Sequence, residues 1–300
     1  MLAVLFAGQG DEIARLLPDW EARSAAVRRL LELAAAEVGI PRDGLHARGG
    51  RALHRTEILQ PAMTALSLGI WEELRALGVE PGVVAGHSLG EIAAVSAAGA
   101  FSPEDAVSFA ALRGRAMARE AARHAGGMVA CHGSAAAVDR ALQAAGLTGA
   151  VDIAALNTPD QTVVAGPITA LRRLGSVIPT TRLDVAGPWH HRDMRGAVAE
   201  VRADAERRIR GPLRIPWISN RHGDPVESAS DVARLLAEQL VCPVQWVRTV
   251  RTLGDLGVRR IITVASKSLR GLVRDCPGRP AVHSVTRPDA LATLIPSPSP

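Results

Sequence analysis

The sequence predicts an α/β fold in which a small domain is inserted into a larger one. Three observations lead to this prediction. Short apolar runs alternate with stretches of helical periodicity, a pattern typical of a parallel sheet covered by helices. A serine between two glycines follows one of these runs. A middle segment has its own order of strands and helices, and the 300 residues exceed the usual size of one domain.

The N-terminal part contains two predicted strands and four predicted helices. Ser102 marks the start of the last helix, because a serine cap, a proline in the first turn and two acidic residues favour a helix N-terminus. In chain order we expect strand 2–7, helices 21–38 and 60–77, strand 83–85, helix 91–98 and a helix from 103 to about 123.

The middle segment changes character after Gly126 and Gly127. Its predicted elements are strand 128–132, helix 135–145, strands 151–156 and 161–165, helix 169–174 and strand 180–185. The order β-α-β-β-α-β is that of a ferredoxin-like unit. We therefore predict a ferredoxin-like small domain at residues 125–187, inserted into a large domain formed by residues 1–124 and 188–300. The remaining predicted elements are helix 201–210, strand 215–219, helix 232–240 and strand 260–264.

The stretch GHSLG at residues 86–90 has the pattern of a nucleophile elbow. Side chains at Gly86 and Gly90 would collide with the backbone of so tight a turn. The turn lifts Ser88 above the sheet at the start of a helix, which makes the large domain α/β-hydrolase-like. The backbone N–H of Leu89 is then placed to stabilise an oxyanion. The alternative is a glycine-rich turn with an incidental serine.

A serine hydroxyl needs a base to take its proton before it becomes a good nucleophile. His190 and His191 follow a rigid Gly-Pro pair where the chain re-enters the large domain, so they are the candidate bases. His87 is expected to be structural, since it points to the other side of the turn from Ser88. Arg113 lies in the apolar face of its helix. It either snorkels or pairs with an internal acid, or it binds a ligand carboxylate through two parallel hydrogen bonds.

Composition argues against several classes of protein. Three phenylalanines and no tyrosine leave no stacking platform for single-stranded nucleic acid. Cys131, Cys242 and Cys276 are far apart, which argues against a disulfide frame or a zinc site. There is no basic leader and no run of about 18 apolar residues. We expect a cytoplasmic monomer that binds no metal, membrane or nucleic acid. Its charge of +5 reflects either solvated helix faces or an anionic partner.

Several motifs together resemble one family, the malonyl-CoA:acyl-carrier-protein transacylases and the acyltransferases of modular polyketide synthases. Their order and spacing are specific, although no single motif is. The motifs are FAGQG at the start, GHSLGE at 86–91, LRGRAM at 112–117, NTPDQTVVAG at 157–166, GPWH at 187–190, SN at 219–220 and CPVQW near residue 245. The family's fold agrees with the one predicted above.

The resemblance implies roles for particular residues. Ser88 would be the acyl-accepting nucleophile and His190 its base. Gln9 and Leu89 would supply the backbone N–H groups of the oxyanion hole. His191 stands where the family commonly has a serine, so His190 rather than His191 matches the catalytic position.

The resemblance also implies how the acyl group is selected. Arg113 would bind the free carboxylate of the extender unit, and Gln60 would line the same pocket. Gln245, in the segment matching PVQW, would orient the histidine. Trp189 is bulkier than the usual residue before the catalytic histidine, which favours malonyl over a branched unit. The sequence departs from the family pattern at Ala7, at Asp11-Glu12 and at Ala265-Ser266-Lys267.

The function implied is ping-pong transfer of a malonyl group from malonyl-CoA to the phosphopantetheine thiol of an acidic acyl carrier protein, with no bound cofactor. The pathway would be polyketide or fatty-acid biosynthesis. Two alternatives stay open. One is transfer of an unusual acyl unit between carrier proteins, and the other is a proofreading hydrolase that clears acyl groups from carrier proteins.

Overall fold

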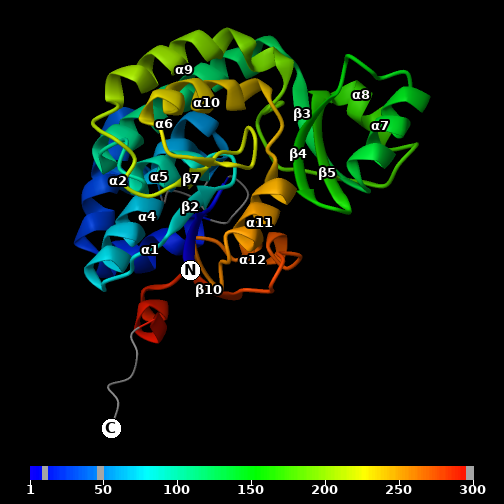
Figure 1. Cartoon of the computed structure of the whole chain (residues 1–300). Coiled ribbons are helices and arrows are strands. Elements are labelled where there is room, and N and C mark those ends of the chain that lie inside the picture. Colours follow the sequence, from blue (N-terminus) through cyan, green and yellow to red (C-terminus); the bar gives the residue numbers. More distant parts are fainter. Residues whose placement is uncertain (9–12, 46–50, 295–300) are drawn as a thin grey trace.

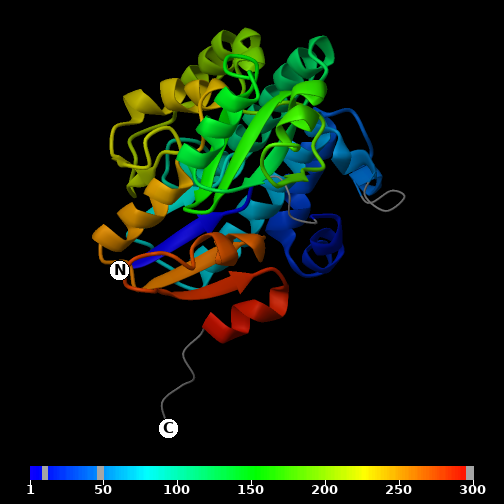
Figure 2. The same cartoon turned by 90° about the vertical axis from the view of Figure 1, so that its right-hand side faces the viewer.

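The computed structural model describes residues 1–8, 13–45 and 51–294 (Figure 1). It consists of a large part built on a mainly parallel sheet and a small part built on an antiparallel sheet. The small part, which carries α7 and α8, lies to the right in Figure 1 and in front in Figure 2. Of the residues predicted for the site, Gln9 lies outside the described ranges.

The large sheet has six strands in the order β10-β9-β1-β2-β7-β8. All neighbours are parallel except β7 and β8. The strands are β1 (Leu2–Phe6), β2 (Val83–Gly86), β7 (Trp217–Ile218), β8 (Pro225–Val226), β9 (Arg260–Val264) and β10 (Ala281–Val285). The central strand β1 reads LAVLF and is buried along nearly its whole length, as expected for a parallel strand covered on both faces. Ser88 follows the carboxyl end of β2, the edge where open α/β sheets bind ligands.

Helices surround this sheet. They are α1 (Ile13–Arg23), α2 (Ala25–Glu37), α4 (Thr56–Ala76), α5 (Gly90–Ala97), α6 (Pro103–Arg123), α9 (Arg195–Arg208), α10 (Val232–Glu238), α11 (Trp246–Asp255) and α12 (Ser268–Leu272). Short 3₁₀ turns are η1 (Arg42–Leu45), η2 (Arg51–His54), η3 (Arg192–Met194), η4 (Ala229–Asp231), η5 (Gln239–Val241) and η6 (Pro288–Leu294). The predicted cap of α6 is confirmed, because Ser102 Oγ accepts a hydrogen bond from Asp105 N at 3.0 Å.

α4 and α6 pack against each other at Gly114. A Cβ at this position would lie 2.9 Å from both Glu57 Cα and Thr56 O, so a larger residue would push the helices apart. The close approach places Arg113, the neighbour of Gly114, against Gln60, which lies one turn beyond Thr56 on α4.

The small sheet has the order β4-β5-β3-β6, and its pairings are antiparallel. Its elements are β3 (Gly126–His132), α7 (Ala135–Ala144), β4 (Asp152–Thr158), β5 (Gln161–Pro167), α8 (Ile168–Leu174) and β6 (Thr180–Arg182), all within the segment predicted to be inserted. Alternate residues of β3 face opposite ways. Met128 and Ala130 join the core of the large part, whereas Val129 and Cys131 pack with α7 and α8.

The sequence analysis missed or merged several elements. A single helix is predicted over 21–38, but Ser24 caps α2, its Oγ accepting from Val27 N at 3.1 Å, and thereby separates α2 from α1. No prediction covers α11, β8 or β10. α11 is rich in β-branched residues, yet Trp246 and Val250 share its buried face, so tertiary packing overrides propensity.

Among the described residues, no helix is both long enough and apolar enough to span a membrane.

Candidate active site

The predicted elbow is present between β2 and α5. A Cβ at Gly86 would collide with the carbonyl group of Gly90, and a Cβ at Gly90 would collide with the carbonyl oxygen of Phe6. Ser88 has a φ of 50°, a left-handed conformation that is strained for a residue with a side chain. Both glycines are therefore needed for the turn that exposes the Ser88 hydroxyl.

Ser88 and His190 are brought together, as predicted. Ser88 Oγ lies 2.7 Å from His190 Nε2, and His190 Nδ1 lies 2.7 Å from the backbone carbonyl oxygen of Gln239. A carbonyl oxygen can only accept, so Nδ1 carries the proton and Nε2 has the lone pair that accepts from the Ser88 hydroxyl. This is the tautomer that a general base needs.

The partner of the histidine differs from the prediction. Gln245 was expected to orient His190, but the structure places the Gln239 carbonyl at Nδ1. Gln239 opens the 3₁₀ turn that follows α10, where a helix end leaves carbonyl groups without helical partners. Gln245 instead donates its backbone N–H to Asn220 O at 2.8 Å. The acceptor for His190 Nδ1 therefore lies six residues nearer the N-terminus than predicted.

His190 is 4% exposed. Burial lowers the pKa of His190 to about 3, and the charge of Arg113 acts in the same direction, whereas the hydrogen bond to Gln239 opposes it. A base must be unprotonated to accept the serine proton, and here the neutral form persists well below the ordinary histidine pKa.

We expect the rate of Ser88 acylation to stay level as the pH falls from 7 to 5. An ordinary histidine with a pKa near 6.5 would lose activity roughly 25-fold over that range, because the protonated form cannot act as a base. Single-turnover formation of the acyl-enzyme across this range is the measurement. A fall in rate centred near pH 6.5 would contradict the role of burial.

Arg113 is buried, with 2% of its surface exposed. It donates from Nη1 to Gln60 Oε1 and from Nη2 to Gln239 Oε1, both at 2.7 Å. Burial lowers the pKa of Arg113 to about 10, which leaves it charged at neutral pH. No carboxylate of the described residues forms an ion pair with it. Two neutral amides thus hold a cation that still has N–H donors to offer.

Sequence reasoning missed a buried acid, Glu91, which has no exposed surface. Its Oε1 accepts from Asn220 N at 2.6 Å, and its Oε2 accepts from Gln239 Nε2. Burial raises the pKa of Glu91 to about 8, and these hydrogen bonds and the charge of Arg113 oppose the shift. The acid fixes the Gln239 amide with its oxygen towards Arg113. In the sequence, the only indication of this acid was its position as the last residue of the GHSLGE motif.

Gln239 connects the parts of the site. Its side-chain nitrogen also donates to Ser88 O at 3.0 Å, its side-chain oxygen holds Arg113, and its backbone oxygen holds His190. Asn220, from the predicted SN motif, accepts from Ser88 N at 2.7 Å through Oδ1. Ser88, His190 and Arg113 therefore all form hydrogen bonds with one glutamine.

The N–H group of Leu89 is at the start of α5. No described residue accepts a hydrogen bond from it, so it stays a candidate oxyanion donor. The second candidate, Gln9, lies outside the described residues.

The other predicted residues lie around this centre. Trp189 is buried, and its ring lies beside Gly187, where a Cβ would be 2.7 Å from Cη2. His87 Nε2 lies 2.8 Å from Asn157 Oδ1, away from the Ser88 hydroxyl. His191, the other candidate base, lies instead beside Asp152, with Nε2 3.4 Å from its Oδ2.

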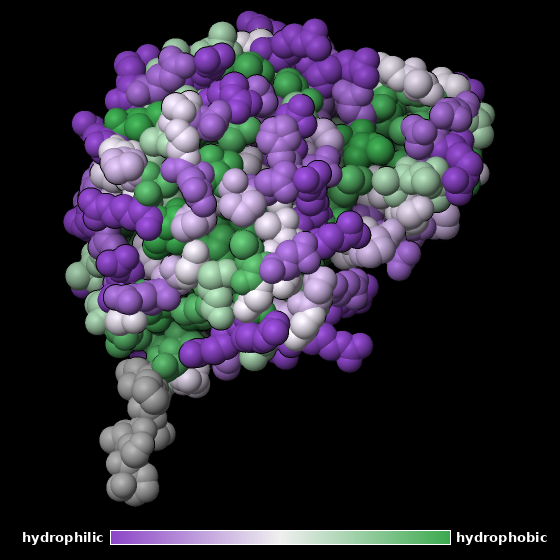
Figure 3. All heavy atoms as spheres, in the orientation of Figure 1, coloured by the Kyte–Doolittle hydropathy of each residue, from purple (hydrophilic) through white to green (hydrophobic). Residues whose placement is uncertain are grey.

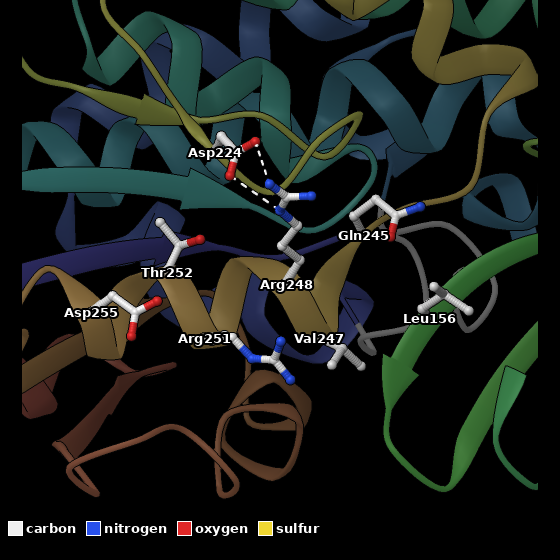
Figure 4. A pocket seen from close by; sticks show the side chains of 8 residues that line it. All are labelled: Leu156, Asp224, Gln245, Val247, Arg248, Arg251, Thr252 and Asp255. Atoms are coloured by element: carbon white, nitrogen blue, oxygen red, sulfur yellow. Dashed lines mark hydrogen bonds and ion pairs between the residues drawn. The ribbon is translucent and has the colours of Figure 1, made fainter.

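A groove of about 360 Å³ runs along α11 near the site (Figure 4). Its lining includes Leu156 of β4, Gln245 just before α11 and Arg251 of α11 (Figure 4). Arg248 turns to Asp224 and forms two hydrogen bonds with it, at 2.9 and 3.1 Å. Gln245 thus borders a surface groove.

A strained serine, a neutral histidine and a candidate oxyanion donor at a helix start form an arrangement that can transfer an acyl group through the serine. The chain belongs to the acyl transferase domain family, whose model matches residues 4–271. This membership confirms the resemblance drawn from the motifs.

Two curated relatives are similar to this chain in sequence over nearly its whole length. The malonyl CoA-acyl carrier protein transacylase of Mycobacterium tuberculosis is 33% identical over 312 residues, covering 98% of this chain and 100% of the relative. Polyketide biosynthesis protein ThaF of Burkholderia thailandensis is 36% identical over 309 residues, covering 97% of this chain. The chain spans about a quarter of ThaF, 26% of its length.

Solved structures agree with the fold class predicted from the sequence. A malonyl-CoA:acyl carrier protein transacylase from Xanthomonas oryzae pv. oryzae matches with a TM-score of 0.90 and 29% identity, covering 98% of this chain and 97% of the other. A malonyl-transacylase in complex with its type II polyketide synthase acyl-carrier protein matches with a TM-score of 0.90 and 27% identity, covering 98% of both chains.

Proposed function

We propose that this protein transfers a malonyl group from malonyl-CoA to the phosphopantetheine thiol of an acyl carrier protein, in fatty-acid or polyketide synthesis. The observation that carries the proposal is Arg113, a buried cation held by two neutral amides and linked through Gln239 to Ser88 and His190. The names of the relatives support the same substrate and the same partner.

Acylation begins when Ser88 Oγ attacks the thioester carbonyl carbon of malonyl-CoA and its proton passes to His190 Nε2. The Leu89 N–H, with Gln9 as the proposed second donor, stabilises the oxyanion of the tetrahedral intermediate. When the intermediate collapses, the C–S bond breaks and the leaving CoA sulfur takes the proton from His190. The products are free CoA and a malonyl ester on Ser88.

Transfer to the carrier protein runs through the same groups. His190 takes the proton of the phosphopantetheine thiol, and the sulfur attacks the ester carbonyl carbon. The C–O bond to Ser88 then breaks, and Oγ recovers the proton from His190. No resident cofactor or metal has a part in either half of this reaction.

Arg113 makes the reaction selective for an acyl group with a free carboxylate. The malonate carboxylate would satisfy the N–H donors that Gln60 and Gln239 leave free, in a bidentate geometry that suits a guanidinium. An acetyl group would leave that buried cation without its charge partner. Trp189 would limit the size of the acyl group.

The test is a comparison of acyl donors. Incubation with malonyl-CoA should add one malonyl group to the intact protein, and a holo acyl carrier protein should then remove it as a thioester. Equal labelling by acetyl-CoA would contradict the role of Arg113. Release of free malonate at the rate of transfer would identify a hydrolase, and labelling by acyl carrier proteins alone would identify transfer between carriers.

A further inference from the structure

The small domain carries a second cavity that the acyl-transfer chemistry does not use. Its volume is about 340 Å³, and it lies between α8 and the strands β3 and β6. The apolar part of its lining consists of Met128, Val129, Ile168, Leu171, Leu183 and Val185. Figure 3 shows apolar surface among hydrophilic side chains on this lobe of the molecule. Such a cavity can receive an apolar side chain of a partner.

Two arginines, Arg172 at the end of α8 and Arg182 at the end of β6, line the same cavity. Among the described residues, no Asp or Glu lines it. Within the described part of the chain, neither arginine makes an ion pair or a side-chain hydrogen bond. Asp184, next to the lining residue Leu183, lies 3.4 Å from His54 instead. The cavity is thus an apolar hollow edged by unpaired positive charge.

The cavity is close to the catalytic centre along the chain. Val185 lines it, and His190 follows five residues later, so the two Cα atoms are at most about 17 Å apart even if the chain is fully extended. Gly126, another lining residue, packs on Pro188, since a Cβ there would lie 2.6 Å from Pro188 Cγ. A protein bound at the cavity could therefore deliver a long flexible arm to Ser88.

We propose that this cavity, edged by Arg172 and Arg182, is a docking surface for the acidic acyl carrier protein. The inference rests on the proposed function and adds to it the surface that recognises the partner. Carboxylates of the carrier would meet the two guanidinium groups, and an apolar side chain beside them would enter the hollow. Charge complementarity of this kind acts mainly on association and specificity, which suits a partner that must leave after each transfer.

The experiment separates the two halves of the reaction. In the double variant Arg172→Glu/Arg182→Glu, malonyl-CoA should load Ser88 at the wild-type rate. The kcat/KM for transfer to a holo acyl carrier protein of a bacterial fatty-acid system should fall about tenfold or more, mainly through KM, because attraction becomes repulsion. Transfer to free pantetheine, which has the same thiol but no protein surface, should not change. Added salt should slow carrier transfer by the wild type more than by the variant.

Two further variants extend the experiment, the first as a control and the second as an independent test of the hollow. Arg140→Glu reverses an exposed charge on α7 of the same domain, away from the cavity lining, and should leave carrier transfer unchanged. Gly127→Val fills the hollow without changing charge, because a Cβ at Gly127 lies 3.9 Å from Ile168 Cγ1 in ordinary contact. This variant should also raise the KM for the carrier protein.

The outcomes distinguish this inference from the proposed function. If wild-type protein takes no malonyl group from malonyl-CoA, the proposed function fails. If loading is normal and the double variant transfers to the carrier protein as well as Arg140→Glu does, the docking surface is wrong. A higher KM for malonyl-CoA in the double variant would overturn the proposal as well, since the arginines would then bind the phosphates of CoA.

Discussion

Replacement of Ser88 by alanine is expected to abolish the covalent malonyl adduct and to lower malonyl transfer by about 10⁴-fold or more. The reason is that alanine has no hydroxyl oxygen with which the acyl group could form an ester, and no hydroxyl proton for His190 to remove. Intact-protein mass spectrometry after incubation with malonyl-CoA measures the adduct, and a thiol-release assay measures the rate.

A second serine gives the matched control for this variant. Ser67 is buried on α4, and its Oγ has no hydrogen-bond partner among the residues that the structure describes, so Ser67→Ala should retain both adduct and rate. A malonyl adduct that persists in Ser88→Ala would place the nucleophile elsewhere and would remove the basis of the mechanism.

Replacement of Arg113 by methionine should lower malonyl loading by about 10²–10⁴-fold and leave acetyl loading equal or higher. Removing one partner of a buried charge pair costs about 3–5 kcal/mol, and each 1.36 kcal/mol corresponds to a factor of ten. In this case the second partner is the malonate carboxylate. Rates of Ser88 acylation by malonyl-CoA and acetyl-CoA, measured side by side, give the selectivity directly.

Arg115 provides the control on the same helix. It is exposed and donates from Nη1 to Glu37 O at 2.9 Å, so Arg115→Met should keep the wild-type preference. A uniform loss with both donors in Arg113→Met would indicate a structural role for the arginine, and selectivity would then have another source.

Sequence reasoning reached the proposed nucleophile, the proposed base and the buried cation because each depends on residue type at a particular spacing. The glycines at 86 and 90 are required by the backbone of the elbow. Arg113 stands out as a charge in an apolar stripe, and its helix starts at a recognisable cap, Ser102. These predictions were possible because each depends on residues that are close together in the sequence.

The remainder of the site depends on contacts that residue type does not reveal. A backbone carbonyl holds His190, and any residue could supply it, so the visible side chain of Gln245 was chosen instead of Gln239 O. Glu91 resembles an ordinary acid in the first turn of a helix, and its burial follows from the packing of α5 beneath Gln239. The missed strands β8 and β10 lie at the edges of the sheet, where little apolar patterning is needed, and β8 has only two residues.

Gln239 holds Arg113 through its side-chain oxygen and His190 through its backbone oxygen. These two contacts limit how this protein could acquire a different substrate. A neutral replacement for Arg113 would leave the side-chain oxygens of Gln60 and Gln239 buried without a donor, which costs about 1–3 kcal/mol for each. Rotating the Gln239 amide to compensate would disturb the residue that also orients the histidine. A change in acyl preference without loss of stability would therefore require coordinated substitutions on α4, α6 and the segment after α10, because a single exchange at the arginine alters the selectivity but destabilises the folded protein.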